Sequence, residues 1–201
     1  MYLGRYTGLL CLFFVIATLI KFHSRCCAGE KAPWRGAEHE DVARRLGEQG
    51  DFFLFPAEDA AAAADWVVEV VTERIPQTFG FDGLEDIQVL SPLYRGPAGV
   101  TILNERLQEK LNPPANGKVE KSLYGTIFRV GDKVMQTRNN YDKLVYNGDI
   151  GFIQGMDLVN QTLAVDFEGR PAEYEWSETD ELTLAYAVSV HKAQGAEFPV
   201  I

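Results

Sequence analysis

Apolar residues follow a helical spacing in the first half of the ordered chain. They recur in two stripes, at Ala60, Ala64, Val67, Val68, Val71 and Ile75, and at Val100, Leu103, Leu107 and Leu111. Short apolar strands are expected before each helix, at Phe52–Phe55 and Ile87–Leu90. Pro56 is expected to open the first helix, and the stretch IPQTFGFDGLED to form a loop. This order predicts part of a parallel α/β sheet.

From Tyr124 the pattern changes to short alternating runs separated by glycine, asparagine and aspartate. Asn147-Gly148-Asp149 and Glu168-Gly169-Arg170 are turn signals, and four to five strands fit into the segment. We predict a small antiparallel barrel, because isolated hairpins leave unsatisfied edges. The apolar pattern returns at Leu182–Ala187, where the α/β sheet is expected to resume after an insertion.

The first thirty residues differ from the rest. Residues 9–20, LLCLFFVIATLI, form an apolar run between Arg5 and Lys21. The run is shorter than the roughly 20 residues that span a bilayer, and it has the form of a secretion signal with Cys26-Cys27-Ala28 as its cleavage site. Two explanations stay open at this point: a targeting or anchoring segment, or a spurious start. Residues 31–50 have no clear period and are expected to be a linker.

Charge is distributed unevenly along the chain. Its 19 basic and 29 acidic residues give a net charge of −10, which argues against coating nucleic acid through overall charge. The window 118–143 is nevertheless net +3. It contains six basic residues, Lys118, Lys121, Arg129, Lys133, Arg138 and Lys143, and three acidic residues, Glu120, Asp132 and Asp142.

Cysteine occurs only near the start of the chain, at Cys11, Cys26 and Cys27. A disulfide framework would distribute cysteines through the fold, so the body is expected to be cytoplasmic. Adjacent Cys26 and Cys27 do not have the spacing of a zinc site, and no metal site is expected.

Two loops carry residues suited to nucleic acid. In SPLYRGPAG, Arg95 stands beside Gly96 at the start of a helix, which favours a phosphate, and Tyr94 offers a ring for stacking a base. The alternative is that Tyr94 packs and Arg95 is solvated. In QTRNNYDK, cations, amides and a ring alternate, as in a groove for single strands, although a polar hairpin loop has the same composition.

A third candidate is AVSVHKAQGAEF, residues 187–198, where a glycine turn could hold backbone N–H groups, a lysine and an amide against a phosphate. This stretch, together with RVGDKVMQTRNNYD and VYNGDIGFI, resembles the RecD-like branch of superfamily 1 DNA helicases. IQVLSPLYRGPAGVTILNERLQ is similar to the second motor domain of the same family. The resemblance covers about residues 51–201.

The resemblance implies a fold and its domains. Residues 51–115 and 182–201 would belong to a second RecA-like motor domain, and residues 116–181 would form an SH3-like barrel inserted into it. The family moves 5′ to 3′ along single-stranded DNA by hydrolysing ATP. The implied partners are therefore single-stranded DNA and ATP, with Mg²⁺ in the complete helicase, and no membrane partner is expected.

The resemblance also implies roles for particular residues. Gln194, Gly195 and Glu197 would lie near the nucleotide, with Glu197 accepting a hydrogen bond from the ribose. A second set would contact single-stranded DNA: Tyr94, Arg95, Gly96, Arg138, Asn140, Tyr141, Lys143, Ser189, His191 and Lys192.

The sequence departs from a complete motor. It lacks a phosphate loop of the form G-x-x-x-x-G-K-[ST], because Gly117-Lys118 is followed by Val119. The acidic metal-binding motif and the arginine motifs of such motors are not recognisable either, so no catalytic set is complete. We therefore expect a piece of a helicase that does not hydrolyse ATP alone and binds single strands weakly and salt-sensitively. The alternatives are a stand-alone, non-catalytic single-strand-binding module, or an exported or anchored protein.

Overall fold

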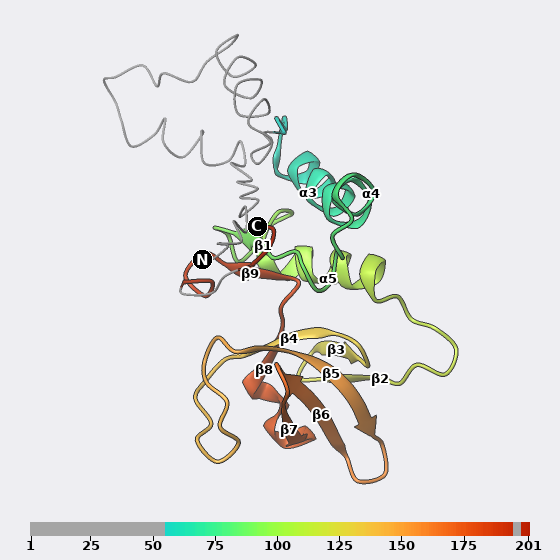
Figure 1. Cartoon of the computed structure of the whole chain (residues 1–201), viewed down its shortest axis with the longest axis vertical. Coiled ribbons are helices and arrows are strands. Elements are labelled where there is room, and N and C mark those ends of the chain that lie inside the picture. The colour runs from blue at the N-terminus through green and yellow to red at the C-terminus, as the bar shows by residue number, and fades with distance from the viewer. Residues whose placement is uncertain (1–54, 195–197) are drawn as a thin grey trace, which may run out of the picture.

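The protein is described from a computed structural model, and the description is given for residues 55–194 and 198–201. The predictions for residues 1–30 and 31–50 and for most of the strand at 52–55 lie outside these described residues. Figure 1 shows a helical rod at the top, a helix with paired strands in the middle, and a small barrel below, which we call the top, middle and lower tiers.

The top tier is one continuous helical rod. It consists of α3 (Ala60–Glu69), a π-helical turn η1 (Val70–Arg74) and α4 (Ile75–Phe79). The prediction that Pro56 opens the helix is wrong. The rod begins at Ala60, because Asp59 has an extended backbone and its carboxylate caps the N–H groups of Ala61 and Ala62 at 2.9 and 2.8 Å.

The loop expected from Ile75 is also wrong in its first part, because the helix continues to Phe79. A proline inside a helix clashes with the carbonyl four residues earlier, and the wider π turn directly before Pro76 is one way to accommodate it. The rod ends at Gly80, whose φ of 75° is the left-handed conformation typical of a helix terminus.

The middle tier contains a parallel strand pair, as the sequence predicts. Strand β1 (Val89–Ser91) pairs with β9 (Ala187–Ser189) in the register Val89–Ala187 to Ser91–Ser189. A further parallel bridge joins Ile87 to Val200. The segment that follows the barrel therefore returns to the strand that precedes it.

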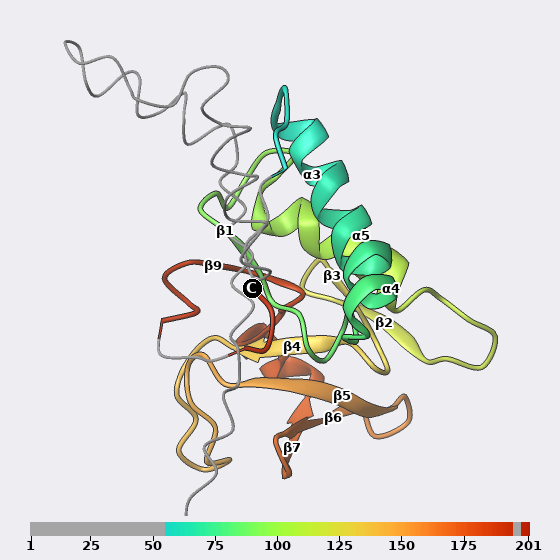
Figure 2. The same ribbon diagram turned by 45° about the horizontal axis from the view of Figure 1, so that its top comes forward.

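Helix α5 (Val100–Leu111) lies between the strand pair and the upper rod, and the predicted stripe faces inward at Leu103 and Leu107. Asn104 connects the helix to β9: its Nδ2 donates to the Ala187 carbonyl at 2.8 Å, and its Oδ1 accepts from the Ala187 N–H at 3.0 Å. Figure 2 shows α5 running next to the rod.

The lower tier is an antiparallel barrel. Strands β2 (Glu120–Leu123) and β3 (Thr126–Arg129) form a hairpin. A five-stranded sheet has the order β7-β6-β5-β4-β8. Its strands are β4 (Lys133–Gln136), β5 (Ile150–Asp157), β6 (Thr162–Phe167), β7 (Arg170–Glu175) and β8 (Leu182–Leu184), with a 3₁₀ segment η2 (Trp176–Glu181) before the last. The short antiparallel strands predicted from alternating runs are thus confirmed, with more strands than expected; the hairpin and the five-stranded sheet together are called the barrel.

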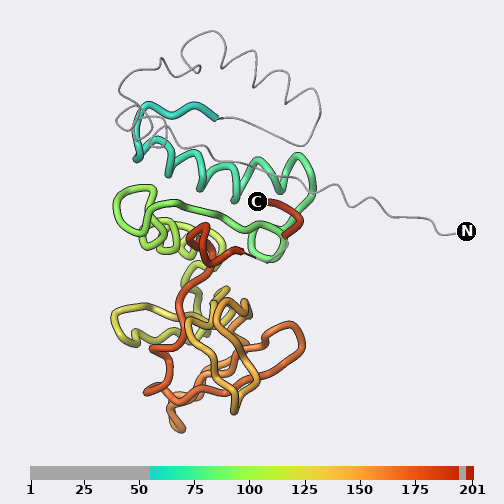
Figure 3. Tube along the Cα trace, turned by 90° about the vertical axis from the view of Figure 1, so that its left-hand side faces the viewer, coloured from blue at the N-terminus to red at the C-terminus, as the bar shows by residue number. Residues whose placement is uncertain are grey.

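The turn predicted at Glu168-Gly169 is confirmed. Both residues have positive φ, 53° and 83°, which is the geometry of a two-residue hairpin connection. The sheet was expected to resume at Leu182, but β8 pairs with β4 of the barrel, and only Ala187–Ser189 pairs with β1. Residues 182–188 are apolar except for Thr183 and contain no glycine, proline, asparagine or aspartate, so no turn residue marks where the chain leaves the barrel. Figure 3 shows this segment rising from the barrel toward the strand pair.

The core extends through all three tiers. In the barrel, Phe128, Phe167 and Tyr174 are buried, and the Tyr174 hydroxyl donates to Gln136 Oε1 at 2.9 Å. Trp66, expected in the core, is half-buried, and the Arg74 guanidinium lies 4.7 Å from its ring. None of the helices in residues 55–194 is long and apolar enough to cross a membrane.

Candidate nucleic-acid interface

Two of the predicted segments follow neighbouring parallel strands. The loop after β1 is Pro92–Gly99, and the turn after β9 begins at the last residue of that strand, Ser189. Because Ser91 and Ser189 are in register, both segments leave the sheet at the same edge, where ligands bind in open α/β sheets. The register thus brings Tyr94, Arg95 and Gly96 to the same edge as His191 and Lys192.

The loop after β1 is closed from within. Ser91 Oγ lies 2.8 Å from the Ala98 carbonyl, and the Leu93 N–H donates to Ser91 Oγ at 3.2 Å. Tyr94 is 65% exposed, so the alternative that it packs is wrong. Arg95 is exposed and forms no ion pair within the described part of the chain.

The start of α5 offers less to a phosphate than the sequence suggests. The Val100 N–H donates to the Leu93 carbonyl at 2.9 Å, and the Thr101 N–H points to the Tyr94 carbonyl at 3.4 Å. Two of the N–H groups that a helix leaves free at its N-terminus are therefore directed at the loop itself. The positive charge here comes mainly from the Arg95 side chain.

The loop 137–149 between β4 and β5, which contains the predicted segment QTRNNYDK, contacts the turn after β9. Lys192 Nζ donates to Asn147 Oδ1. Ser189 begins this turn, since its carbonyl accepts from the Lys192 N–H at 2.9 Å, and His191 is exposed. Figures 1 and 2 both show the three segments on the same side of the molecule.

The cations of loop 137–149 are paired with carboxylates of η2. Arg138 Nη2 lies 2.5 Å from Asp180 Oδ2, and Lys143 Nζ lies 2.7 Å from Glu178 Oε2. Asn140 Nδ2 donates to Glu181 Oε2 at 3.2 Å. The hydrogen bond from Lys143 is the main reason why the pKa of Glu178 is lowered. Three of the four DNA-contact residues predicted in this loop thus already have acidic partners.

The aromatic residues of the loop are exposed. Tyr141 is 70% exposed and Tyr146 is 42% exposed, and their rings meet edge to face with centroids 6.1 Å apart at 75°. The sequence motifs pointed to Tyr141 but not to Tyr146. The signal for Tyr146 was its place directly before the Asn147-Gly148 turn, opposite Tyr141 across the loop.

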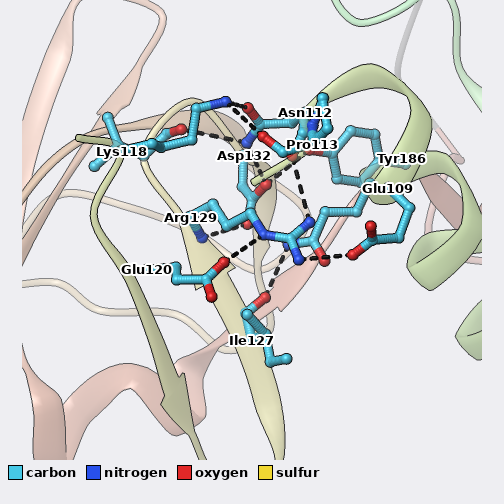
Figure 4. A network of polar contacts seen from close by, with 11 residues as sticks. Glu109, Asn112, Pro113, Lys118, Glu120, Ile127, Arg129, Asp132 and Tyr186 are labelled. Carbon is cyan, nitrogen blue, oxygen red and sulfur yellow. Dashed lines mark hydrogen bonds and ion pairs between the residues drawn. The ribbon is translucent and has the colours of Figure 1, made fainter. Parts of the chain in front are cut away.

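A buried polar network, to which no sequence motif points, joins the barrel to the middle tier (Figure 4). Asp132 is fully buried and its carboxylate accepts four hydrogen bonds at 2.6 to 2.8 Å. The donors are Gln108 Nε2, Asn112 Nδ2, the Arg129 N–H and the Tyr186 hydroxyl. Burial raises the pKa of Asp132, and the four hydrogen bonds oppose that shift.

Two basic residues of the +3 window, Arg129 and Lys133, complete this network. We call the network the joint between the barrel and the middle tier. Arg129 is buried and pairs with Glu109 at 2.6 Å and Glu120 at 2.8 Å. Lys133 is 2% exposed and its Nζ donates to the carbonyls of Leu84 and Ile87, both at 3.1 Å. Burial lowers the pKa of Lys133 to about 8. These cations hold the barrel against the α/β tier and do not face solvent.

The remaining predicted residues fall at or beyond the end of the β9 turn. Gln194 is exposed, whereas Gly195 and Glu197 lie outside the described residues. Across residues 55–194 and 198–201, no group of three or more His, Cys, Asp or Glu residues could hold a metal ion.

Comparison with known proteins identifies a similar domain and similar relatives. Residues 103–167 match the SH3 domain of ATP-dependent RecD-like DNA helicases. The chain is 37% identical over 115 residues to the ATP-dependent RecD2 DNA helicase of Deinococcus radiodurans, an alignment that covers 57% of this chain and 15% of that protein. It is 29% identical over 173 residues to the RecBCD enzyme subunit RecD of Mycolicibacterium smegmatis, covering 84% of this chain and 26% of that protein.

Among solved structures, the Pif1 helicase from Bacteroides in complex with ADP-AlF3 and ssDNA aligns with 84% of this chain and 43% of its own, with a TM-score of 0.42 and 18% identity. The family match begins inside α5 and runs through β6, so it includes Gln108, Asn112, Arg129, Asp132 and Lys133 of the joint. The resemblance noted from the sequence motifs is confirmed: the chain carries an SH3 domain of the RecD-like helicase type and is similar to RecD proteins, of whose length it spans only 15% to 26%.

Proposed function

We propose that this chain acts within an ATP-dependent 5′–3′ DNA helicase, where it contributes a single-strand-contacting surface and one side of the ATP site. In this proposal, the tier of β1, β9 and α5 is part of the second RecA-like motor domain, and the barrel is its SH3-like insertion. The family match and the two RecD relatives support the proposal. A role in recombination or repair belongs to the same proposal.

The observation that carries the proposal is the register of β1 with β9. It brings two exposed loops to one sheet edge, and Lys192 then contacts Asn147 of the barrel loop. Arg95, His191 and Lys192 are the positive or titratable side chains at this edge without a described carboxylate partner, so we assign the phosphate contacts to them. Gly96 has no side chain, so single-stranded DNA can approach the backbone there. Ser189 begins the turn that carries His191 and Lys192.

Binding of labelled oligo-dT at several salt concentrations tests this surface. Each phosphate contact to a single strand contributes roughly 0.7 to the slope of log K against log salt. Lys192→Ala and Arg95→Ala should each weaken binding and reduce the slope by about that amount. Lys110→Ala removes an exposed cation from the last turn of α5 and is the matched control. Equal losses in all three variants would contradict the assignment.

The nucleotide side of the proposal rests on Gln194, Gly195 and Glu197. Bound ATP with Mg²⁺ supplies the phosphoryl group whose transfer drives such motors, and catalysis needs a phosphate loop that this sequence lacks. We therefore propose that these 201 residues do not hydrolyse ATP on their own. A phosphate-release assay with and without oligo-dT tests this, and turnover above the protein-free rate would overturn it.

A further inference from the structure

Loop 137–149 exposes two tyrosine rings beside the proposed path of the strand. Tyr141 and Tyr146 face solvent while they contact each other edge to face at 6.1 Å. Single exposed rings are common on soluble proteins, whereas exposed apolar groups gathered in one place mark binding surfaces, and here two rings are gathered in one loop. Bases of unpaired nucleic acid have exposed π faces and stack on such rings.

The loop that carries the rings is firmly held. Asn140 and Val145 exchange two backbone hydrogen bonds of 2.8 and 3.1 Å, and Val145 is fully buried. The Asn147 N–H donates to Asn139 Oδ1 at 2.9 Å, which closes the loop at its other end. Because the backbone is already ordered, a base that stacks here does not have to order it.

The charge of the loop is largely compensated. Arg138 and Lys143 are paired with Asp180 and Glu178, so a phosphate could bind them only by replacing a carboxylate. Such an exchange gains little, since one anion substitutes for another. What the loop offers without exchange is its two rings.

We propose that Tyr141 and Tyr146 form a stacking site for a base of an unpaired strand, so that this loop recognises bases rather than phosphates. The inference rests on the proposed function, because the strand must first lie along this side of the molecule. Lys192, held beside Tyr146 by its contact with Asn147, is placed to hold the adjoining phosphate. A duplex does not satisfy the site, since its bases are already stacked on each other.

The test compares the binding of oligo-dT with that of an abasic oligonucleotide of the same length to the full chain. Tyr146→Ala and Tyr141→Ala should each weaken oligo-dT binding by about fivefold or more, and Tyr146→Phe should retain it. Neither alanine variant should change binding of the abasic strand or the salt slope. Tyr124→Ala removes an equally exposed ring from the β2–β3 hairpin and is the control.

The outcomes separate this inference from the proposed function. If Lys192→Ala weakens oligo-dT binding but the tyrosine variants do not, the proposed surface stands and the stacking site is wrong. An equal loss for oligo-dT and the abasic strand also overturns the stacking site. If the unmodified chain does not bind oligo-dT at all, the proposed surface and this inference fail together. Urea unfolding midpoints of all variants should match, which excludes loss of fold as the cause.

Discussion

Two regions of the same barrel differ in how deeply their basic residues are buried. At the joint, defined by Gln108, Asn112, Arg129, Asp132, Lys133 and Tyr186, the cations are buried and connect the barrel to the α/β tier. In loop 137–149 the cations lie near the surface and pair with η2. Neither region presents free positive charge to solvent, although both lie in the window that is net +3.

The comparison shows why the net charge of a sequence window overstates its attraction for nucleic acid. The two remaining lysines of the window are also engaged: Lys118 Nζ donates to the Pro113 carbonyl at 3.1 Å, and Lys121 Nζ lies 4.6 Å from the ring of Trp176. All six basic residues of the window therefore have partners within the fold. The side chains left for phosphate, Arg95 and Lys192, are outside the window.

The largest effect is expected at the buried end of this comparison. Asp132→Ala leaves four donors without their acceptor, and hydrogen bonds to a buried charged group are strong. We expect a loss of about 3 kcal/mol in the free energy of unfolding, measured by urea denaturation.

Asp142→Ala is the matched control for Asp132, since it removes an exposed carboxylate ten residues along the same segment. Its unfolding free energy should stay within about 0.5 kcal/mol of the unmodified chain. Equal effects of the two substitutions would remove the distinction between the joint and the loop.

Lys133 should make the stability of the joint depend on pH. Its pKa is about 8 in the folded chain against 10.5 for a free lysine, and burial outweighs the opposing attraction of Asp86, Asp82 and Glu85. Between these two values the unfolded chain holds a proton that the folded chain has released, so folding becomes more favourable as pH rises.

The measurement is the difference in unfolding free energy between the unmodified chain and Lys133→Met. From near pH 7 to near pH 9.5 it should shift by about 2 kcal/mol in favour of the unmodified chain. Other titrating groups are common to both proteins and cancel in the difference. Parallel pH curves would mean that Lys133 is hydrated and does not share the buried character of the joint.

Much of the fold could be predicted because its signals are local. The stripe at Leu103 and Leu107 identified α5, and Glu168-Gly169 identified a hairpin turn. The joint could not be predicted in this way. Gln108 resembles an ordinary solvated helix residue, and Asp132, next to Gly131, resembles an ordinary turn residue. Gln108 and Asp132 are hydrogen-bonded to each other although they lie 24 residues apart in the sequence, and no periodicity connects them.

The sequence predicts which residue types lie at the candidate site. It does not predict which of their charged groups are already paired within the fold. The motifs identified Arg138 and Lys143, yet their carboxylates lie 42 and 35 residues later in η2, where WSETDE looks like a solvated acidic turn. The proximity of Lys192 to Asn147 likewise depends on how β9 returns beside β1. Such long-range pairings are properties of the topology, which short patterns do not encode.

The smallest effect is expected when Arg138 of the loop is released from its ion pair and becomes able to bind a phosphate. The Arg138–Asp180 pair is exposed, so Asp180→Asn should change the unfolding free energy by less than about 1 kcal/mol. It should, however, release Arg138 and steepen the salt slope of oligo-dT binding by roughly 0.7. Arg138→Ala should change binding little in the unmodified chain and remove the gain in the Asp180→Asn background.

A general effect of net charge is separated by Glu173→Gln, which removes one exposed carboxylate from β7 and should leave the salt slope unchanged. If Glu173→Gln and Asp180→Asn steepen the slope equally, the gain comes from overall charge and not from Arg138. If Arg138→Ala alone weakens binding as much as Lys192→Ala, the strand already exchanges with Asp180. The loop would then bind phosphates directly, and its cations, unlike those of the joint, would be available to a ligand.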